Sequence, residues 1–477
     1  MKGAVNMKFD MVLSGGWVVD PANGFEGTAD VGIAEGSVAQ VAPELDPGKS
    51  AVVHDVSGLV VMPGVVDMHV HTSRRHKGHN AHRMMAKAGV VTALDMGGPL
   101  DEFFEFSKHN SAGLNLAGLQ QVRPGHTVAG DDPGEGEIRG LLEQSIEEGA
   151  VGLKLLGGHY PMTPEATRSV IEVCNAQRRY VAFHSGTTRT PGDLEGFVES
   201  VELAGELRLH IPHINSYCRG VQGSPLAETA EALSVLKGRP NLFTESYLAT
   251  INGTSGRCID GVPESQATQR CLMERGYEPT AGGLQEAIRD GYARVTREYG
   301  AENINVTGEE AVEAWLAEET VVSVNFPVNS AVSRFLCAVS RDENDRFIVD
   351  AISTDGGGHP RNVAVEHGLA LVRAEGLTLS ELVQKISWAP ATILGLPAKG
   401  HLGVGADADL TVVDLERCNA VMSFNAGNLI MYRGAVMGSG TTIITSEAGE
   451  RAVQKRGLDT YVARLEDGIF YGEGRPF

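Results

Sequence analysis

The strongest indication of the fold is the stretch Val61-Met62-Pro63-Gly64-Val65-Val66-Asp67-Met68-His69-Val70-His71. After the Pro-Gly pair it reads as a short apolar β-strand that ends in two histidines separated by one residue. Because side chains alternate along a strand, His69 and His71 point to the same side. At the end of a barrel strand that side is the interior, where two imidazoles can bind one metal ion. We therefore predict a metal site at these two histidines.

Seven further apolar segments follow this strand and alternate with segments of helical periodicity. The eight predicted strands are 65–71, 90–95, 112–119, 150–156, 180–184, 207–214, 240–246 and 348–354. This alternation between residues 63 and 396 is typical of an α/β fold of the (β/α)8 TIM-barrel type. The alternative is a doubly wound parallel sheet, but no G-x-G-x-x-G motif follows an early strand. The segment at about 250–345 interrupts the alternation, and we expect a helical insertion over the barrel mouth.

Short strands separated by turns also occupy both ends of the chain. Near the N-terminus, Asp10–Ser14 and Trp17–Asp20 flank Gly15-Gly16, a pattern typical of a hairpin turn. A similar pattern returns at 408–414 and continues to about residue 444. Neither end holds enough strands for a stable core of its own, so we predict one small β-sandwich domain formed by both chain ends. The expected division is 1–62 and 397–450 for the sandwich, 63–396 for the barrel and 451–477 for a C-terminal helical tail.

Composition and charge narrow the range of partners. The chain has 477 residues, with 40 Lys and Arg against 61 Asp and Glu, and a formal net charge of −21. This balance disfavours binding to duplex nucleic acid or to anionic membranes, and no apolar run approaches the ~20 residues of a membrane span. The six cysteines are scattered without a C-x-x-C pair, as in a reduced cytoplasmic protein. We expect a cytoplasmic homo-oligomer, a dimer or a tetramer, that acts on a small molecule.

Residues of metal-ligand type continue at the ends of later predicted strands. They are Lys154 on the fourth strand, His184 on the fifth, His213 on the sixth and Asp355 on the eighth. One such residue alone is more often a structural hydrogen-bonding group, but five occupied strand ends favour a metal centre at the catalytic face of a barrel. His210 competes with His213 for the inward position, and His213 is preferred because it lies nearer the strand end. The loops hold candidate substrate contacts at His159, Tyr160, Asn215 and His359.

Lys154 is unusual because it lies in the apolar segment Gly152–Leu156. A protonated amine would repel metal cations, but burial and nearby cations lower the pKa of a lysine. The neutral amine can take up carbon dioxide to form a carbamate, and the two carbamate oxygens suit a bridge between two metals. The alternative is a lysine that is salt-bridged to an acidic residue at the barrel rim.

With these residues assembled, the chain resembles the amidohydrolase superfamily, in the neighbourhood of the cyclic amidases (hydantoinase and dihydroorotase) and the N-acyl-D-amino-acid deacylases. The resemblance rests on Pro63–His71 and on two segments similar to the sandwich signatures of the family, Ser14–Pro21 and Gly403–Leu410. It implies two divalent metal ions, first of all Zn²⁺, with Mn, Co or Ni as other options. The implied ligands are His69, His71 and Asp355 for one metal, His184 and His213 for the second, and carboxylated Lys154 as the bridge.

The resemblance points to two branches of the family. Phe243–Tyr247 and the long insertion before the eighth strand resemble the acyl-amino-acid deacylases. That branch carries Gly-Asn-Cys-Gly after the second strand, where this chain has Asp95-Met96-Gly97-Gly98, and Lys154 resembles the hydantoinases and dihydroorotases. The substrate therefore stays open between a cyclic amide or imide and an N-acyl amino acid.

The implied reaction is hydrolysis of a carbon–nitrogen bond other than a peptide bond, of the EC 3.5 type. A metal-bridged hydroxide would attack the carbonyl, and Asp355 would act as the acid/base that passes the proton to the leaving nitrogen. One alternative is a mononuclear ring deaminase in which Lys154 is structural, but Asn215–Cys218 lacks the glutamate expected after the sixth-strand histidine. The other is a non-enzymatic, dihydropyrimidinase-like scaffold, which would have lost ligands that this chain retains.

Overall fold

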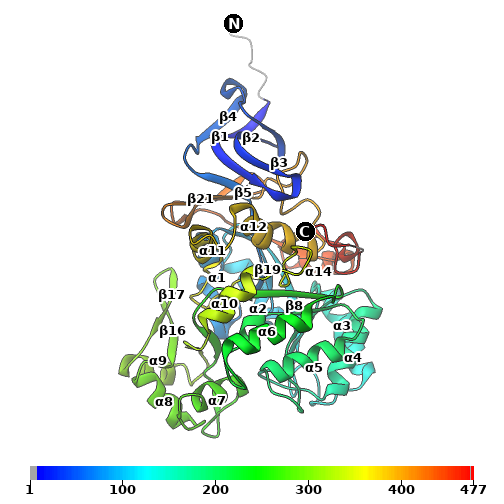
Figure 1. Cartoon of the computed structure of the whole chain (residues 1–477), viewed down its shortest axis with the longest axis vertical. Coiled ribbons are helices and arrows are strands. Elements are labelled where there is room, and N and C mark those ends of the chain that lie inside the picture. The colour runs from blue at the N-terminus through cyan, green and yellow to red at the C-terminus, as the bar shows by residue number, and fades with distance from the viewer. Residues whose placement is uncertain (1–7, 473) are drawn as a thin grey trace.

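The computed structural model describes residues 8–472 and 474–477. Figure 1 shows a strand-rich lobe at the top, a barrel with its helices below it, and a further lobe with helices α7 (Gln266–Met273), α8 (Ala281–Arg289) and α9 (Glu309–Ala317) at the lower left. The first seven residues of the predicted 1–62 segment and position 473 lie outside the described part. The candidate site lies in the barrel, and the other two parts are described for how they pack against the barrel.

Eight parallel strands in sequence order build the barrel. They are β6 (Val65–His71), β7 (Val90–Asp95), β8 (Leu114–Val122), β9 (Gly152–Leu156), β10 (Tyr180–His184), β11 (Leu209–Ile211), β12 (Leu242–Tyr247) and β19 (Ala351–Ser353), which is continued by β20 (Gly356–Gly357). β19 pairs with β12 and β20 pairs with β6, so the two pieces of the eighth strand close the ring. All eight predicted strands overlap the observed ones, and the TIM-barrel prediction is confirmed.

Helices connect these strands and cover the outside of the barrel. They are α1 (Gly78–Lys87), α2 (Leu100–His109), α3 (Glu135–Glu148), α4 (Pro164–Ala176), α5 (Leu194–Ala204), α6 (Pro225–Leu236), α11 (Ala364–Arg373), α12 (Leu379–Val383) and α13 (Ala389–Ile393). The sequence specifies where α4 and α6 begin. Thr163 and Ser224 accept hydrogen bonds from backbone N–H groups in the first turn, and a proline follows each of them.

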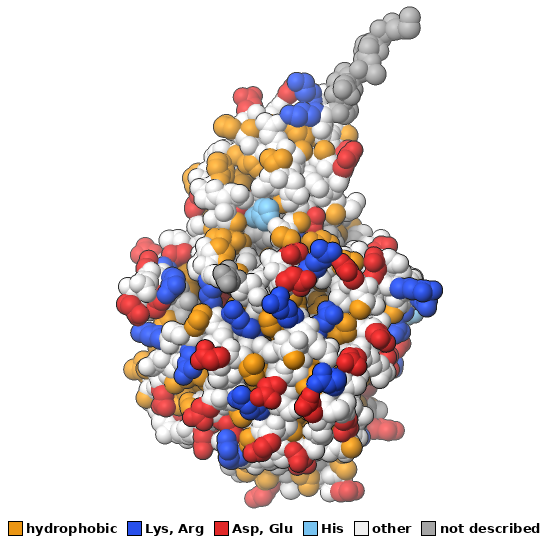
Figure 2. All heavy atoms as spheres, turned by 90° about the vertical axis from the view of Figure 1, so that its right-hand side faces the viewer, with side chains coloured by type: hydrophobic (Ala, Val, Ile, Leu, Met, Phe, Trp, Pro, Cys, Tyr) orange, Lys and Arg blue, Asp and Glu red, His pale blue; other side chains and the backbone are white. Residues whose placement is uncertain are grey.

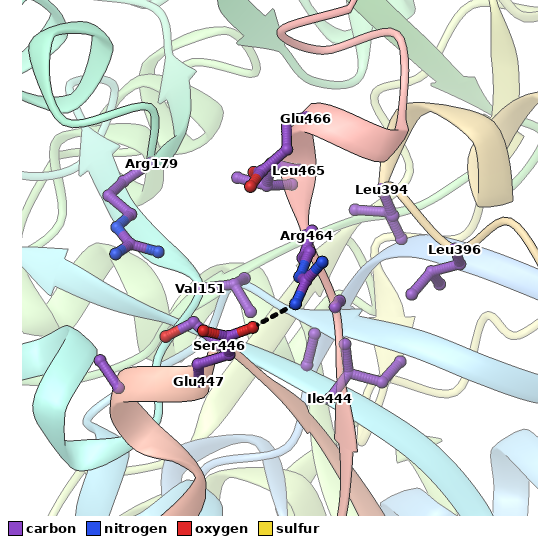
Figure 3. A pocket seen from close by; sticks show the side chains of 13 residues that line it. Val151, Arg179, Leu394, Leu396, Ile444, Ser446, Glu447, Arg464, Leu465 and Glu466 are labelled. Atoms are coloured by element: carbon purple, nitrogen blue, oxygen red, sulfur yellow. Dashed lines mark hydrogen bonds and ion pairs between the residues drawn. The ribbon is translucent and has the colours of Figure 1, made fainter.

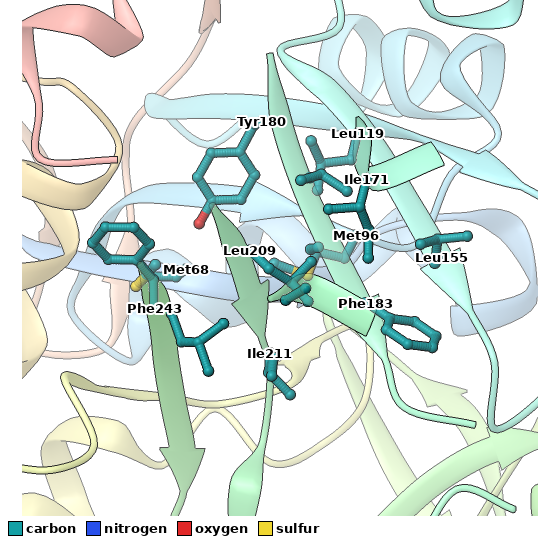
Figure 4. Packing of buried hydrophobic residues seen from close by; sticks show 14 of the residues in the cluster. Met68, Met96, Leu119, Leu155, Ile171, Tyr180, Phe183, Leu209, Ile211 and Phe243 are labelled. Atoms are coloured by element: carbon teal, nitrogen blue, oxygen red, sulfur yellow. The ribbon is translucent and has the colours of Figure 1, made fainter. Parts of the chain in front are cut away.

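Aromatic side chains close the end of the barrel opposite to the histidines. Tyr180 lies four residues before His184, and Phe243 lies two before Glu245, so alternation places both rings on the inward face (Figure 4). Phe470, from the last segment of the chain, is fully buried against them, with ring centroids 4.4 Å from Tyr180 and 4.9 Å from Phe243. The interior is therefore packed at one end and polar at the other.

Both chain ends contribute to one nine-stranded sheet. Its strands are β1 (Phe9–Asp20), β2 (Phe25–Ala34), β3 (Ser37–Ala42), β4 (Ser50–Asp55), β5 (Val60–Pro63), β21 (Leu410–Asp414), β22 (Asn419–Asn425), β23 (Asn428–Tyr432) and β24 (Ala435–Val436). β21 pairs antiparallel with β5, with Thr411 opposite Met62. The expectation of one strand-rich domain formed by both ends is confirmed. The predicted hairpin at Gly15-Gly16 is wrong, because β1 continues through these glycines with an irregularity in its register to β2.

The insertion before the eighth strand carries a sheet as well as helices. Strands β13 (Asn252–Ser255), β18 (Ser323–Phe326), β16 (Arg294–Tyr299) and β17 (Glu302–Val306) pair in that order, β14 (Cys258–Ile259) pairs with β15 (Val262–Pro263), and α10 (Ala331–Val339) follows. The expectation of a helical insertion was incomplete. Charged and polar residues occupy much of β16 and β17, so these strands lack the apolar pattern that marks the barrel strands.

The last part of the chain forms a strand–helix–strand unit, here called the C-terminal unit: β25 (Thr441–Thr445), α14 (Glu447–Lys455) and β26 (Asp459–Val462). β25 pairs in parallel with Leu114–Ala117 of β8, and β26 pairs in parallel with β25. The structure therefore differs from the predicted boundary at 450 and from a purely helical tail. β9 pairs only with the later part of β8, from Leu119, so the earlier part of β8 has a free edge. The β-branched residues of β25 pair with that edge.

Two observations bear on the expected partners. No helix in the described part of the chain is long and apolar enough to cross a membrane. On the face drawn in Figure 2, several basic side chains form a row across the middle of the molecule, and acidic side chains are mixed with basic ones below that row.

Candidate metal centre

Three buried side chains from different parts of the barrel converge at its polar end. Ligand atoms of His69 on β6, His213 after β11 and Asp355 after β19 all lie within 4.8 Å of one another. His69 Nε2 is 3.4 Å from Asp355 Oδ1, and His71 Nε2 is 2.8 Å from the same oxygen. This set combines residues that the resemblance assigns to two different metals.

Backbone conformation at two of these positions is unusual. His213 has φ of 44° and Asp355 has φ of 50°, both in the left-handed region that non-glycine residues seldom adopt. At Asp355 this conformation falls at the break between β19 and β20, which turns the carboxylate towards β6. Strained backbone held by its surroundings is typical of functional sites.

A second layer of hydrogen bonds orients the histidines. His69 Nδ1 lies 2.8 Å from Glu245 Oε1 on β12, and His213 Nδ1 lies 2.7 Å from Ser216 Oγ. Both rings therefore keep Nε2 for the centre of the cluster, as in metal sites where a carboxylate holds the far side of a histidine. Burial raises the pKa of Glu245 to about 8. Glu245 was not among the residues predicted from the sequence, although it is a charged residue within an apolar strand, like Lys154.

The histidines of the cluster are held in the form that binds metals. Burial lowers the pKa of His69, His184 and His213 well below the usual value, so these rings are neutral at neutral pH. His184 ends β10, and its ring lies against that of His213 with centroids 4.5 Å apart. His210, the competitor of His213, also points into the barrel, where it is fully buried and its Nδ1 lies 3.0 Å from the hydroxyl of the inward-facing Tyr180. The expectation that only one of these two histidines points inward was therefore wrong, although His213 is the one that joins the cluster.

Lys154 is 1% exposed on β9, and its Nζ lies 3.3 Å from Met96 Sδ. No ion pair joins Lys154 to a carboxylate among the residues that the structure describes. Burial lowers the pKa of Lys154 to about 7, although Glu245 and Asp355 act in the opposite direction. A large fraction of the amine is therefore neutral near neutral pH, which is the form that reacts with carbon dioxide.

Asp355 is ionised in spite of its burial. Burial alone would raise its pKa, but Arg361, His69 and His71 outweigh that effect and hold the pKa of Asp355 well below its usual range. Arg361 Nη2 is 2.6 Å from Oδ2 of this carboxylate, and Arg361 Nε donates to the Asp355 carbonyl oxygen over 2.6 Å. Arg361 thus holds Oδ2 of Asp355, and Oδ1 stays in contact with His69 and His71.

The four predicted substrate contacts fall in different surroundings. The ring of His159 lies 4.7 Å from that of His184, and its Nδ1 lies 2.9 Å from Ser265 Oγ of the insertion. Tyr160 is one residue further along, where the Arg123 guanidinium stacks 4.1 Å above its ring. These two residues therefore link the loop after β9 to the insertion or to the neighbouring loop.

The other two predicted substrate contacts are Asn215 and His359. Asn215 Oδ1 accepts a hydrogen bond from the Tyr247 N–H over 2.9 Å, which ties the turn after β11 to the end of β12. The buried ring of His359 lies 4.8 Å from His76 and 5.8 Å from His71. His76 is a neighbour of the cluster that the sequence analysis did not select.

A cavity of about 220 Å³ lies beside His184 and is lined by residues of the barrel loops and of the insertion. Its cationic residues are Arg219, from the loop after β11, and Arg270, from α7 of the insertion. Arg219 Nε is buried without a hydrogen-bond partner among the described residues. Asp193, also at the cavity, is already used as the N-cap of α5. The cavity therefore holds two arginines, with the carboxylate of Glu274 near both, beside a predicted metal ligand.

Comparisons with known proteins agree with this fold and site. The amidohydrolase family model matches residues 273–441. A dihydroorotase of Anaeromyxobacter dehalogenans is 26% identical over 435 residues, which cover 85% of this chain and 88% of the relative. A dihydroorotase of Citrifermentans bemidjiense is 27% identical over 440 residues, with 85% and 90% covered.

Solved structures share the fold over almost their whole length. The N-acyl-D-glutamate deacylase of Bordetella bronchiseptica, solved with zinc and a phosphonate inhibitor, has a TM-score of 0.65 at 17% identity and covers 91% of this chain and 99% of its own. A D-hydantoinase has a TM-score of 0.59 at 15% identity, with 91% and 98% covered. The chain is therefore similar to the amidohydrolase superfamily, in the neighbourhood of the cyclic amidases and N-acyl-D-amino-acid deacylases, and these similarities indicate a hydrolase that acts on carbon–nitrogen bonds.

Proposed function

We propose that this protein hydrolyses the amide bond of a small molecule, either a cyclic amide or imide or an N-acyl amino acid, at a centre of two divalent metals. The observation that carries the proposal is the convergence of His69, His213 and Asp355 within 4.8 Å at the polar end of the barrel. Dihydroorotase relatives support a cyclic amide, and the deacylase fold neighbour supports an acyl amino acid.

The residues present fit a metal centre. Neutral imidazoles and an ionised carboxylate form a donor set that suits Zn²⁺, and also Mn, Co or Ni. In the proposed arrangement His69, His71 and Asp355 would hold one ion, His184 and His213 would hold the other, and a carbamate on Lys154 would be shared by both. Bound metals would supply activation of water at neutral pH and polarisation of the scissile carbonyl.

Asp355 is proposed as the acid/base of the reaction. Its carboxylate is ionised, so it can take a proton from the attacking water and pass it to the leaving nitrogen. Arg361 holds Oδ2, which leaves Oδ1 to face the substrate side with the two histidines of β6. The hydrogen bond between His69 and Glu245 keeps the ring in one orientation during turnover.

The cavity beside His184 is proposed as the substrate site, with Arg219 and Arg270 as contacts for a carboxylate of the substrate. A guanidinium with an unused N–H group matches a carboxylate in charge and geometry. Arg219→Met should raise KM for substrates with a carboxylate about tenfold to a hundredfold, with a smaller change in kcat. Arg275→Met, at an exposed arginine of the insertion that does not line the cavity, serves as the control and should leave KM unchanged. An equal loss of activity on substrates with and without a carboxylate would contradict this role.

We further propose a cytoplasmic homo-oligomer, a dimer or a tetramer. All six cysteines are free, which suits a reducing compartment. The cavity with the predicted ligand His184 is formed within one chain, so catalysis at this site does not require a partner copy. Mass measurement of the native protein in solution tests the oligomeric state.

The decisive experiment combines metal analysis with a substrate screen. Two metals per chain by mass spectrometry, together with turnover of a hydantoin, lactam, dihydropyrimidine or N-acyl amino acid, is the expected result. One metal per chain and turnover of an aminated ring would instead support a mononuclear deaminase. No metal and no turnover would support a scaffold without activity.

A further inference from the structure

A second cavity, of about 430 Å³, lies where the C-terminal unit joins the barrel. The first half of β8 pairs with β25 and its second half pairs with β9, so the two neighbours of β8 diverge and leave space between them. Val151, at the cavity, precedes β9, whereas Lys154 lies further along the same strand. The cavity therefore faces the end of the barrel opposite to the catalytic residues, and its volume falls within the ~300–1,000 Å³ of small-molecule sites.

The floor of this cavity is apolar. Leu394 and Leu396 reach it from the segment after α13, and Ile444 reaches it from β25. Ala117 of β8 and Val151 complete the floor. Such a surface gains free energy when an apolar group covers it, since it would otherwise contact water.

One end of the cavity is built to attract an anion. Helix α14 begins beside it, and the first N–H groups of a helix have no acceptor within the helix. Ser446, the N-cap residue, makes no capping hydrogen bond, is 9% exposed, and has an Oγ without a hydrogen-bond partner among the described residues. The Ser446 hydroxyl and the first N–H groups of α14 therefore lie at the same wall of the cavity, and both are hydrogen-bond donors that can bind an acceptor of a ligand.

Charged residues at the rim determine which anion fits. Arg179 extends into the cavity from the side opposite to Arg464 (Figure 3), and its Nε is buried without a hydrogen-bond partner in the described chain. No carboxylate among the described residues forms an ion pair with Arg179, whereas Arg464 is paired with Glu447. Glu466 stands exposed at the rim and would repel a second negative charge.

We propose that this cavity binds a monoanionic carboxylate with an apolar body. The carboxylate accepts hydrogen bonds from Ser446, from the first turn of α14 and from Arg179, and the body covers Leu394, Leu396 and Ile444. Binding at this place is independent of the proposed amide hydrolysis, because no residue of the metal cluster lines the cavity.

The test uses 4-(4-fluorophenyl)butanoate on the metal-loaded, full-length protein, with binding followed by ¹⁹F NMR. The neutral probe 4-(4-fluorophenyl)butan-1-ol reports the apolar floor alone. Arg179→Met should weaken binding of the carboxylate tenfold or more and leave binding of the alcohol within twofold. Arg178→Met changes the exposed arginine next to it in the sequence and should leave both affinities unchanged.

A second variant tests the cavity itself. Ala463→Phe places a ring in the space above the floor, and it should abolish binding of both probes while the melting temperature stays near that of the wild type. Two results would overturn the proposal. One is the absence of binding to the wild type at millimolar concentrations. The other is binding that neither Arg179→Met nor Ala463→Phe weakens, which would place the carboxylate at the metal cluster.

Discussion

Lys154 decides between two metals and one. If its carbamate bridges the metals, Lys154→Met removes an anionic ligand from both, so the variant should lose most bound metal and most activity. Short carboxylates such as acetate or propionate should partly restore both, measured by metal content and turnover. Lys385 offers a matched control, because it is also a fully buried lysine whose pKa is lowered to about 7, but its Nζ donates to the Val349 carbonyl oxygen. Lys385→Met should show no rescue by carboxylates, and rescue of both variants would contradict the bridging role.

The pKa of Lys154 also predicts how the metal-free protein reconstitutes. Burial lowers that pKa to about 7, so the amine is protonated below this pH and neutral above it. Only the neutral amine adds carbon dioxide, and the rate of activation by zinc plus bicarbonate should therefore rise as pH increases through about 7 and level off above it. Recovery of activity from apoprotein at a series of pH values measures this. A rate that is independent of pH and of bicarbonate would indicate an unmodified lysine.

At the residue scale, the candidate metal ligands on strands could be predicted from the sequence, but the residues that hydrogen-bond to these ligands could not. His69, His71, His184 and Lys154 follow from apolar strands that end or are interrupted by a polar residue. Glu245 gives the same kind of signal, but its contact with His69 depends on which strands face each other across the barrel. No local pattern carries that information, because the two residues lie 176 positions apart.

At the scale of elements, Phe470 carries much of the contribution of the C-terminal segment to stability. It is fully buried against Tyr180 and Phe243, so Phe470→Ala should lower the free energy of unfolding by about 3–5 kcal/mol. Denaturant midpoints measure the change. Phe477→Ala is the control, since that ring is only partly buried and lies edge-on to Trp388, so its loss should lower the free energy of unfolding much less. Equal effects of the two variants would show that Phe470 does not seal the barrel.

The elements that the sequence predicted well are those that bury one continuous apolar face. The barrel strands are such elements, and each was found at its predicted place. Gly15-Gly16 was misread because a glycine pair fits a bulge as well as a turn, and Gly15, with φ of 76°, bonds to Asp30 Oδ1 within a continuing strand. β25 was assigned to the sandwich because its apolar pattern does not specify which free edge it joins.

At the scale of the whole molecule, the barrel is closed at one end by packing and lined at the other by the polar groups of the proposed metal centre. Neutral histidines and a buried lysine without a paired carboxylate contribute little to stability by themselves, since burial of polar groups costs free energy unless they are bound. The metals would then hold together β6, β9, β10 and the segments after β11 and β19. Stability of the barrel and occupancy of the site are therefore expected to be coupled.

That coupling predicts the effect of metal removal. Ions that bind only the folded chain stabilise it by an amount that grows with their free concentration, about 4 kcal/mol at a thousand times Kd. A chelator should therefore lower the melting temperature by several degrees, and added zinc should restore it, as measured by differential scanning fluorimetry. His69→Ala, which removes a ligand from the centre, should melt at the lower temperature with or without the chelator. An unchanged melting temperature in wild-type protein that has lost its metal would show that the histidine cluster is stable when empty, and that the metals serve chemistry alone.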